Sequence, residues 1–238
     1  MDTHAEAGRF LKSLPHFARV QSATINAIAS RCRLKSWEAG RDLFLEGDPC
    51  QDLCILVSGR VKCLRASPEG REQILKIFEH PGEMFCTTSA FSTESHIVSA
   101  RAMNDVRLYL VDVDTMKRAA LSEPTMALAL VTAAGDQMRS LVSLADDLSL
   151  KTATARVAKL LLERAQAEGG RRGERIRLQR SGLREDDIAA RVGTVRVHVS
   201  RSLKTLATMG AITLNRDTIR INDVKALEGF LHAVEHEC

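Results

Sequence analysis

The spacing of apolar residues changes twice along this chain, and each change predicts a different kind of element. From Arg33 to about Val113, apolar and β-branched residues form short runs. Turn sequences such as Glu46-Gly47-Asp48-Pro49 separate the runs, which glycine punctuates at Gly40, Gly47, Gly59, Gly70 and Gly82. Short strands bounded by glycine and proline turns are typical of an antiparallel β-roll or jelly roll.

A helical spacing follows between about Ser122 and Leu148, where Pro124 and Gly135 are the only proline and glycine. One face of this segment repeats at alternating steps of four and three residues, through Leu130, Ala134, Gln137, Leu141, Leu144 and Leu148. Such a seam is typical of a coiled-coil dimer helix. We therefore expect these six residues to form a homodimer interface.

The remainder of the chain predicts a winged helix-turn-helix. A helix over about Lys151–Ala167 ends at Gly169-Gly170, and residues 184–209 form two short helices hinged at Gly193, where glycine allows a positive φ. A β-hairpin then turns at Asn215-Arg216-Asp217 as the wing. The inward residues of the two short helices are expected to be Ile188, Ala189, Val192, Val195, Val199, Leu203 and Leu206.

The outward face of the second short helix has the composition of a DNA-reading surface. Its start meets base edges in the major groove in such motifs. The residues expected to contact DNA are Thr194, Arg196, Val197, Ser200, Arg201 and Lys204.

Charge supports this assignment through its distribution. The whole chain has a net charge of +4, but residues 149–238 hold 17 Lys and Arg against 11 Asp and Glu, a net +6. Residues 1–148 hold the other 17 basic residues against 19 acidic ones, a net −2. Because the positive half coincides with the helix-turn-helix, we expect double-stranded DNA as the partner.

The 238 residues suit a roll over 1–121, a dimer helix over 122–148 and a DNA-binding domain over 149–238. An apolar run of about 18 residues is absent, and the amino terminus lacks a basic-then-apolar signal pattern, so we expect a cytoplasmic protein with no membrane partner. The six cysteines are irregularly spaced, which favours reduced thiols over a disulfide framework.

Four motifs carry a resemblance to a known family. They are Phe44-Leu-Glu-Gly-Asp-Pro, Val57-Ser-Gly-Arg-Val-Lys, Pro81-Gly-Glu-Met-Phe and the stretch from Asp187 to Lys204. In this order they resemble the CRP/FNR family of bacterial transcription regulators over nearly the whole chain. The resemblance implies an α+β fold with an N-terminal cyclic-nucleotide-binding-like β-roll, a long dimerisation helix and a C-terminal winged helix-turn-helix. It also implies a homodimer on a palindromic operator, and RNA polymerase as a partner if the protein is an activator.

Within the resemblance, Arg196 and Arg201 match arginines of the recognition helix, and Ser200 matches a serine of the FNR-like branch. Val197 departs from the pattern, because many members carry a base-reading glutamate there. Glutamate accepts a hydrogen bond from cytosine N4, whereas valine offers apolar contact, for instance with a thymine methyl. We therefore expect a different half-site at this position.

The resemblance leaves the effector open. Members that bind cyclic nucleotides have a Gly-Glu and a phosphate-gripping Arg-Ser pair, whereas this chain has Gly82-Glu83 but His96-Ile97. Without the arginine, a cyclic phosphate lacks its main cation, which disfavours a cyclic nucleotide. Iron–sulfur members cluster cysteines before the roll, where this chain has only Cys32, which disfavours that cofactor too.

Thiols are what the roll does contain. A two-residue hairpin turn at Ser58-Gly59 would place Cys54 directly across from Cys63. Cys86 resembles the cysteine of the haem-containing, carbon-monoxide-sensing branch, although Thr88 stands where that branch has a histidine, and His96 is then a substitute ligand. Cys86 and His96 are thus the metal candidates. The full effector set is Cys54, Cys63, Glu83, Cys86, Thr87, Thr88 and His96.

Three alternatives remain at this point. A buried free cysteine often packs as a small hydrophobe, so haem or thiol sensing stands against another small molecule, such as a cyclic nucleotide, or no ligand. A thiol redox enzyme built around Cys86 is disfavoured by the absence of Cys-X-X-Cys and other catalytic motifs. A haem or ligand storage module without DNA binding would not need Arg196 and Arg201.

Overall fold

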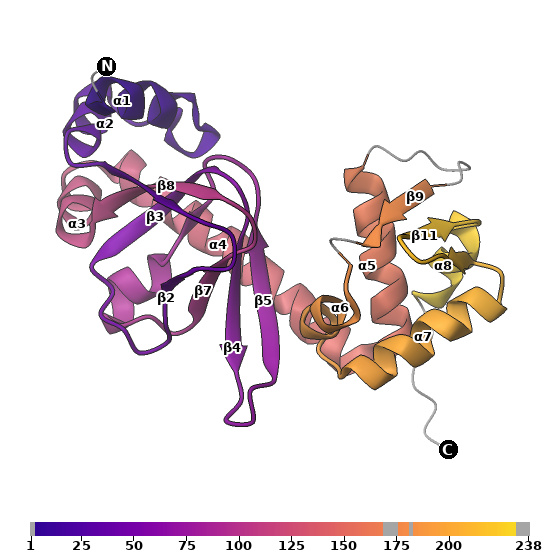
Figure 1. Cartoon of the computed structure of the whole chain (residues 1–238). Coiled ribbons are helices and arrows are strands. Elements are labelled where there is room, and N and C mark those ends of the chain that lie inside the picture. The colour runs from indigo at the N-terminus through magenta and orange to yellow at the C-terminus, as the bar shows by residue number, and fades with distance from the viewer. Residues whose placement is uncertain (1–2, 169–175, 181–182, 232–238) are drawn as a thin grey trace. The chain divides into compact units, whose positions relative to one another are not determined.

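The computed structural model describes residues 3–168, 176–180 and 183–231 (Figure 1). The chain forms two compact units. One comprises Met1–Arg65 and Leu75–Leu141, and the other comprises Ala66–Ile74 and Val142–Cys238. Within the described residues, no helix is both long and apolar enough to cross a membrane.

The predicted β-roll is confirmed as two antiparallel four-stranded sheets. One sheet has the strand order β1-β8-β3-β6 and the other has the order β2-β7-β4-β5. The strands are β1 (Arg33–Trp37), β2 (Asp42–Phe44), β3 (Asp52–Ser58), β4 (Val61–Ala66), β5 (Glu72–Phe78), β6 (Met84–Phe85), β7 (Ser99–Ala102) and β8 (Val106–Asp112).

The central residues of β3, Leu53 to Leu56, are apolar because both faces of the strand are buried there. Successive side chains of a strand point to opposite faces of the sheet. Leu53 and Ile55 pack with the neighbouring helices, whereas Cys54 and Leu56 pack in the core between the two sheets.

The expected pairing of Cys54 with Cys63 is wrong, because β3 and β4 belong to different sheets. Cys54 lies opposite Phe85 on one side and Leu110 on the other, while Cys63 lies opposite Ala100. The turn at Gly59 has a φ of +95° and carries the chain from one sheet to the other. Both thiols still face the core between the sheets.

Helices cover the outer face of one sheet. The N-terminal α1 (Thr3–Ser13), η1 (Pro15–Phe17) and α2 (Ser22–Ala29) were not predicted, and α3 (Val113–Ser122) follows β8 directly. The long helix is confirmed as α4 (Pro124–Leu150), which begins at a proline, a residue suited to a first helical turn. These helices and one face of β3 share a single buried cluster.

The expected seam on α4 needs correction. Leu130 is only 7% exposed and packs in this protein's own core, and the side chain of Gln137 bonds to the roll. Ala134, Leu141 and Leu148 of the expected set are exposed, and Leu144 is half-buried. The helix has two apolar stripes, and the exposed one runs through Leu128, Val131, Met138, Leu141 and Val142.

The second unit has the predicted winged helix-turn-helix. Its helices are α5 (Ala153–Ala167), α6 (Glu185–Val192), α7 (Arg196–Thr208) and α8 (Val224–Phe230). A three-stranded sheet of order β10-β11-β9 is made by β9 (Ile176–Gln179), β10 (Ile212–Leu214) and β11 (Thr218–Ile221). The expected stop at Gly169-Gly170 lies outside the described residues.

The hinge between α6 and α7 is at Gly193, whose φ is +68°. Ile188, Ala189, Val192, Val199, Leu203 and Leu206 are buried as expected. Val195 is not, because it is the N-cap residue of α7 and is exposed. Ser202 is buried on that helix, and its Oγ accepts a 3.0 Å hydrogen bond from Thr154 Oγ1.

Candidate functional site

A shallow groove of about 550 Å³ lies along the start of α7. Five of the six residues expected to contact DNA line it, together with one residue of α6: Glu185, Arg196, Val197, Ser200, Arg201 and Lys204. Thr194 does not share this surface. It is 8% exposed, and its hydroxyl lies 3.2 Å from His198 Nδ1.

An ion pair at one end of the groove was missed by sequence reasoning. Arg196 Nε donates to Glu185 Oε2 at 3.2 Å, and Asp186 lies 3.7 Å from the same guanidinium. Both acids are in the first turn of α6, where the helix dipole favours negative charge. That placement was a signal for the pair, because it brings carboxylates beside the start of the next helix.

The roll encloses a second candidate site, a cavity of about 120 Å³. Of the residues predicted for an effector, Cys63, Cys86, Thr88 and His96 line it, whereas Cys54, Glu83 and Thr87 do not. Much of its remaining wall is apolar, with Phe44, Phe78 and Phe85 among the lining residues. Gln137 and Leu141 of α4 close it on one side.

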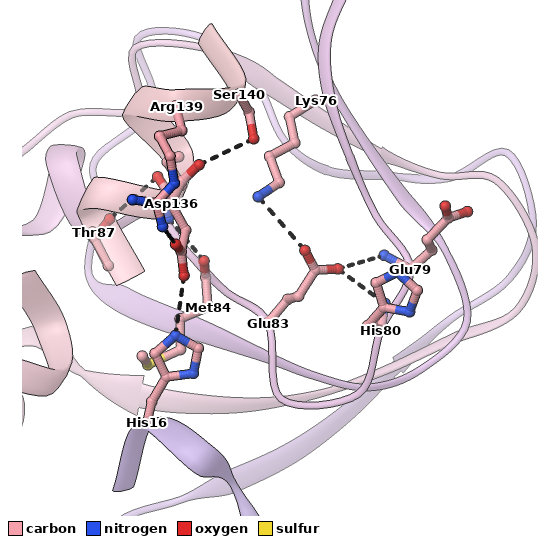
Figure 2. A network of polar contacts seen from close by, with 11 residues as sticks. His16, Lys76, Glu79, His80, Glu83, Met84, Thr87, Asp136, Arg139 and Ser140 are labelled. Atoms are coloured by element: carbon pink, nitrogen blue, oxygen red, sulfur yellow. Dashed lines mark hydrogen bonds and ion pairs between the residues drawn. The ribbon is translucent and has the colours of Figure 1, made fainter. Parts of the chain in front are cut away.

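Glu83 has a structural role in this arrangement (Figure 2). Its Oε2 accepts hydrogen bonds from the backbone N–H groups of Glu79 and His80, at 2.8 and 2.9 Å. Its other carboxylate oxygen lies 3.5 Å from Lys76 Nζ. The carboxylate therefore closes the turn before β6 and is already occupied by three partners.

Two hydrogen bonds tie α4 to the segment that contains Cys86. Gln137 Nε2 donates to the carbonyl oxygen of Met84 at 2.8 Å, and Thr87 Oγ1 donates to Gln137 Oε1 at 3.3 Å. Figure 2 shows the neighbouring Asp136, whose carboxylate lies 3.3 Å from His16 Nε2 and also pairs with Arg139. The helix α4 is thus attached to the roll through Gln137 and to His16 of η1 through Asp136.

His96 is buried in the cavity wall, with 7% of its surface exposed. Its ring stacks on that of Phe44, with centroids 3.6 Å apart and planes within 8°. Burial lowers the pKa of His96, against the opposing attraction of Asp48. Within the described chain, Nδ1 has no hydrogen-bond partner.

Cys86 is the centre of a group of thiols. Its Sγ lies 3.9 Å from that of Cys54, and it also packs against Cys50, which sequence reasoning did not single out. Burial and the hydrogen bonds to these two thiols raise the pKa of Cys86. The hydrogen bond from Cys86 lowers the pKa of Cys50, whereas burial raises the pKa of Cys63 to about 12. Among the described residues, no group of three or more His, Cys, Asp or Glu has the geometry to hold a metal ion.

Comparison with known proteins relates both parts of the chain to one family. Residues 34–123 match the model of the cyclic nucleotide-binding domain, and residues 155–230 match the Crp-like helix-turn-helix domain. The chain is 30% identical over 211 residues to the CRP-like cAMP-activated global transcriptional regulator of Mycobacterium tuberculosis, covering 89% of this chain and 93% of that protein. This chain belongs to the CRP/FNR family of transcription regulators.

A second relative is similar in sequence, and a solved structure is similar in fold. The nitrogen fixation regulation protein FixK of Rhizobium meliloti is 30% identical over 191 residues, which cover 80% of this chain and 82% of that protein. A CRP/FNR-family structure from Eubacterium rectale shares the fold, with a TM-score of 0.77, 22% identity and coverage of 92% and 99% of the two chains. CRP/FNR regulators bind DNA and act as dimers, and these relatives are regulators rather than enzymes.

Proposed function

We propose that this protein is a homodimeric, sequence-specific transcription regulator whose affinity for DNA responds to a signal received beside Cys86. The groove along α7 carries the DNA-binding part of the proposal. Three of its six lining residues, Arg196, Arg201 and Lys204, are cations, and they surround an apolar Val197 that is 66% exposed. Cations at the rim with a short apolar side chain between them suit phosphate contacts and a thymine methyl.

The proposed dimer follows from the exposed stripe on α4. Large apolar side chains at Leu128, Val131 and Met138 are open to solvent, and Met138 is 62% exposed. A second copy of α4 packed on this stripe would bury them in a left-handed coiled coil. Two recognition helices related by the resulting two-fold axis would meet half-sites about 34 Å apart, which predicts a palindromic operator.

The route of the signal is proposed to run through Gln137. Its amide binds the backbone on one side of Cys86 and the Thr87 hydroxyl on the other. A change in charge or packing at Cys86 would therefore alter contacts on α4, the helix that continues from the first unit into the second. A shift in the register of paired helices is an established way to move DNA-binding domains.

The residues present do not fit haem. A cavity of about 120 Å³ is well below the ~300–1,000 Å³ of pockets that bury drug-sized ligands. The Cys86 thiol is engaged with Cys54 and Cys50, and the His96 ring is stacked on Phe44. These contacts favour thiol chemistry or a small apolar molecule as the signal.

A cyclic nucleotide is the second candidate, because some relatives are named as cAMP-activated. The cavity argues against it. Among the described residues that line the cavity, Lys76 is the one Lys or Arg, and it is paired with Glu83. A buried phosphate needs a free cation or an ordered set of amides.

Selection of duplexes from a random oligonucleotide pool tests the DNA-binding proposal. The full-length reduced and oxidised proteins are each used as bait, with and without cyclic AMP. We expect enrichment of a two-fold symmetric sequence in at least one condition. Failure to enrich any sequence in all four conditions would contradict the proposal. Enrichment only with cyclic AMP would favour the second candidate.

A further inference from the structure

Three cysteine thiols meet in one place in the roll, although Cys86 comes 32 residues after Cys54 in the chain. Cys86 Sγ lies 3.9 Å from Cys54 Sγ across the β3–β6 pair. On its other side, Cys86 packs with Cys50, Ala90 and Val113. Cys86 therefore joins two buried clusters, one around Cys54 and one around Cys50.

The backbone at Cys86 makes this meeting possible. Cys86 has a φ of +69°, and within the described part of the chain only Glu94 is another non-glycine residue with positive φ. Strand side chains alternate between faces, so Cys86 would lie on the helix-packed face, like Met84, if β6 continued. The left-handed turn instead brings Phe85 and Cys86 against the same cluster. A non-glycine residue in this conformation is strained by about 1–3 kcal/mol and is often part of a working site.

We propose that Cys50 and Cys86 are a redox site, and that a peroxide converts them to a reversible disulfide. Formation of the disulfide does not depend on the protein being a regulator. Its effect on DNA binding rests on the proposed function. The cavity gives a small oxidant access to Cys86, which packs against Cys50.

The chemistry starts at Cys50. The hydrogen bond from Cys86 lowers the pKa of Cys50, while burial and the same hydrogen bond raise the pKa of Cys86, so Cys50 loses its proton more readily than Cys86. The thiolate is the form of cysteine that reacts with peroxides. Burial raises the pKa of Cys32 and of Cys63 to about 12, which keeps these two thiols unreactive.

The steps balance with hydrogen peroxide as the oxidant. The Cys50 thiolate attacks one peroxide oxygen, an S–O bond forms, the O–O bond breaks and hydroxide leaves. Cys86 Sγ then attacks Cys50 Sγ, an S–S bond forms, the S–O bond breaks, and the oxygen leaves as water with the proton of Cys86. The hydroxide takes up the proton that Cys50 released when its thiolate formed, so two thiols lose two electrons in total and one peroxide becomes two waters. An added dithiol such as dithiothreitol reverses the change.

Closing this bond would move the segment that Gln137 holds. A disulfide brings two sulfurs to about 2.05 Å, far closer than two thiols in packing contact. Cys86 lies between Met84 and Thr87, the two residues that bind Gln137. Oxidation would therefore pull on the attachment between the roll and α4.

The test treats the reduced full-length protein with hydrogen peroxide, blocks free thiols with N-ethylmaleimide, and maps cross-linked peptides by mass spectrometry. We expect a Cys50–Cys86 peptide that dithiothreitol removes. Cys50→Ser and Cys86→Ser should each reduce the cross-link to below about a tenth. Cys32→Ser, a buried thiol in another cluster, is the matched control and should keep the cross-link. Cys54→Ser should also keep it.

Three results would overturn the inference: no cross-link in the wild type, a Cys54–Cys86 peptide as the final product, or loss of the cross-link in Cys32→Ser. Thermal unfolding of each variant, with Cys50→Ala as a second substitution, separates lost chemistry from lost folding. The cross-link is measured without DNA. Its failure therefore leaves the proposed function intact, and failure of DNA selection leaves the disulfide result intact.

Discussion

The side-chain amide of Gln137 donates a 2.8 Å hydrogen bond to the carbonyl oxygen of Met84. Gln137 belongs to a helix whose neighbouring face is open for a partner, and Met84 is two residues before Cys86. The bond thus joins the proposed signal site to the proposed dimer helix. Gln137 is polar although it lies in the apolar repeat of the helix, because its side chain forms hydrogen bonds with the roll of the same chain.

Replacing Gln137 should disconnect the proposed signal site from the proposed dimer helix. Gln137→Leu removes both hydrogen bonds and leaves the Met84 carbonyl without its partner, at a cost of about 1–3 kcal/mol of folding free energy. We expect the change in DNA affinity on oxidation to disappear while the dimer persists. Fluorescence anisotropy with a selected duplex, before and after peroxide treatment, measures this change in affinity. Ser140→Ala is the control, because Ser140 bonds only to the carbonyl of Asp136 on its own helix. An undiminished response in Gln137→Leu would refute this route.

The two stripes of α4 predict opposite phenotypes. Met138→Asp or Leu141→Asp places a charge in the proposed interface and should give folded monomers in sedimentation velocity. Leu130→Ala removes a side chain from the protein's own core and should lower the free energy of unfolding by about 2–5 kcal/mol. If Met138→Asp and Leu141→Asp both sediment as dimers, the exposed stripe is not the interface.

The ion pair at the recognition helix predicts a gain in affinity with a loss of discrimination. Glu185→Gln removes a negative charge from the groove and leaves Arg196 with Asp186 as its more distant acidic partner. Binding to any duplex should tighten several-fold, with a steeper salt dependence, while the ratio of specific to non-specific affinity falls. Titrations of selected and scrambled duplexes at two salt concentrations measure both quantities. Glu163→Gln, a carboxylate outside the groove lining, is the control. Weaker binding of Glu185→Gln to scrambled DNA would contradict the prediction that the Glu185 charge opposes binding to DNA.

The buried His96 should make the stability of the roll depend on pH. Because burial lowers the pKa of His96, the unfolded chain binds a proton near the ordinary value of 6.5 while the folded chain does not. Stability should therefore fall as the pH drops from above 6.5 toward the folded pKa. Urea unfolding at a series of pH values should show this fall in the wild type and a smaller one in His96→Gln. Parallel profiles for the two proteins would show that His96 does not titrate as described.

The winged helix-turn-helix was predictable because its signals are local. Gly193 provides the positive φ of the hinge, the apolar spacing of residues 188–206 marks the inward face, and the wing turns within a few residues. Val195 was misplaced because a residue at a helix N-cap does not follow the helical period. The pairing of the thiols was not predictable in the same way, because strands that follow each other in the sequence here enter different sheets.

The signal site depends on contacts between distant parts of the chain. Cys50 precedes β3, and Cys86 follows β6, and no spacing rule relates them. Likewise, α4 has two apolar stripes, and Leu130 faces inward because it packs in a cluster shared with α1, α2, α3 and the roll. The sequence predicted the long helix and named Cys86 as a candidate thiol, but the residues that each of them contacts are set by tertiary structure.

The affinity for a selected palindromic duplex, compared with a scrambled duplex of equal length at one salt concentration, tests the central claim most directly. For a sequence-specific dimer we expect the selected duplex to bind at least about 10³-fold more tightly. Arg201→Ala should lose about 1–3 kcal/mol of that preference if the guanidinium reads a base. Equal affinity of the wild-type protein for the two duplexes, in both the reduced and the oxidised state, would contradict the account.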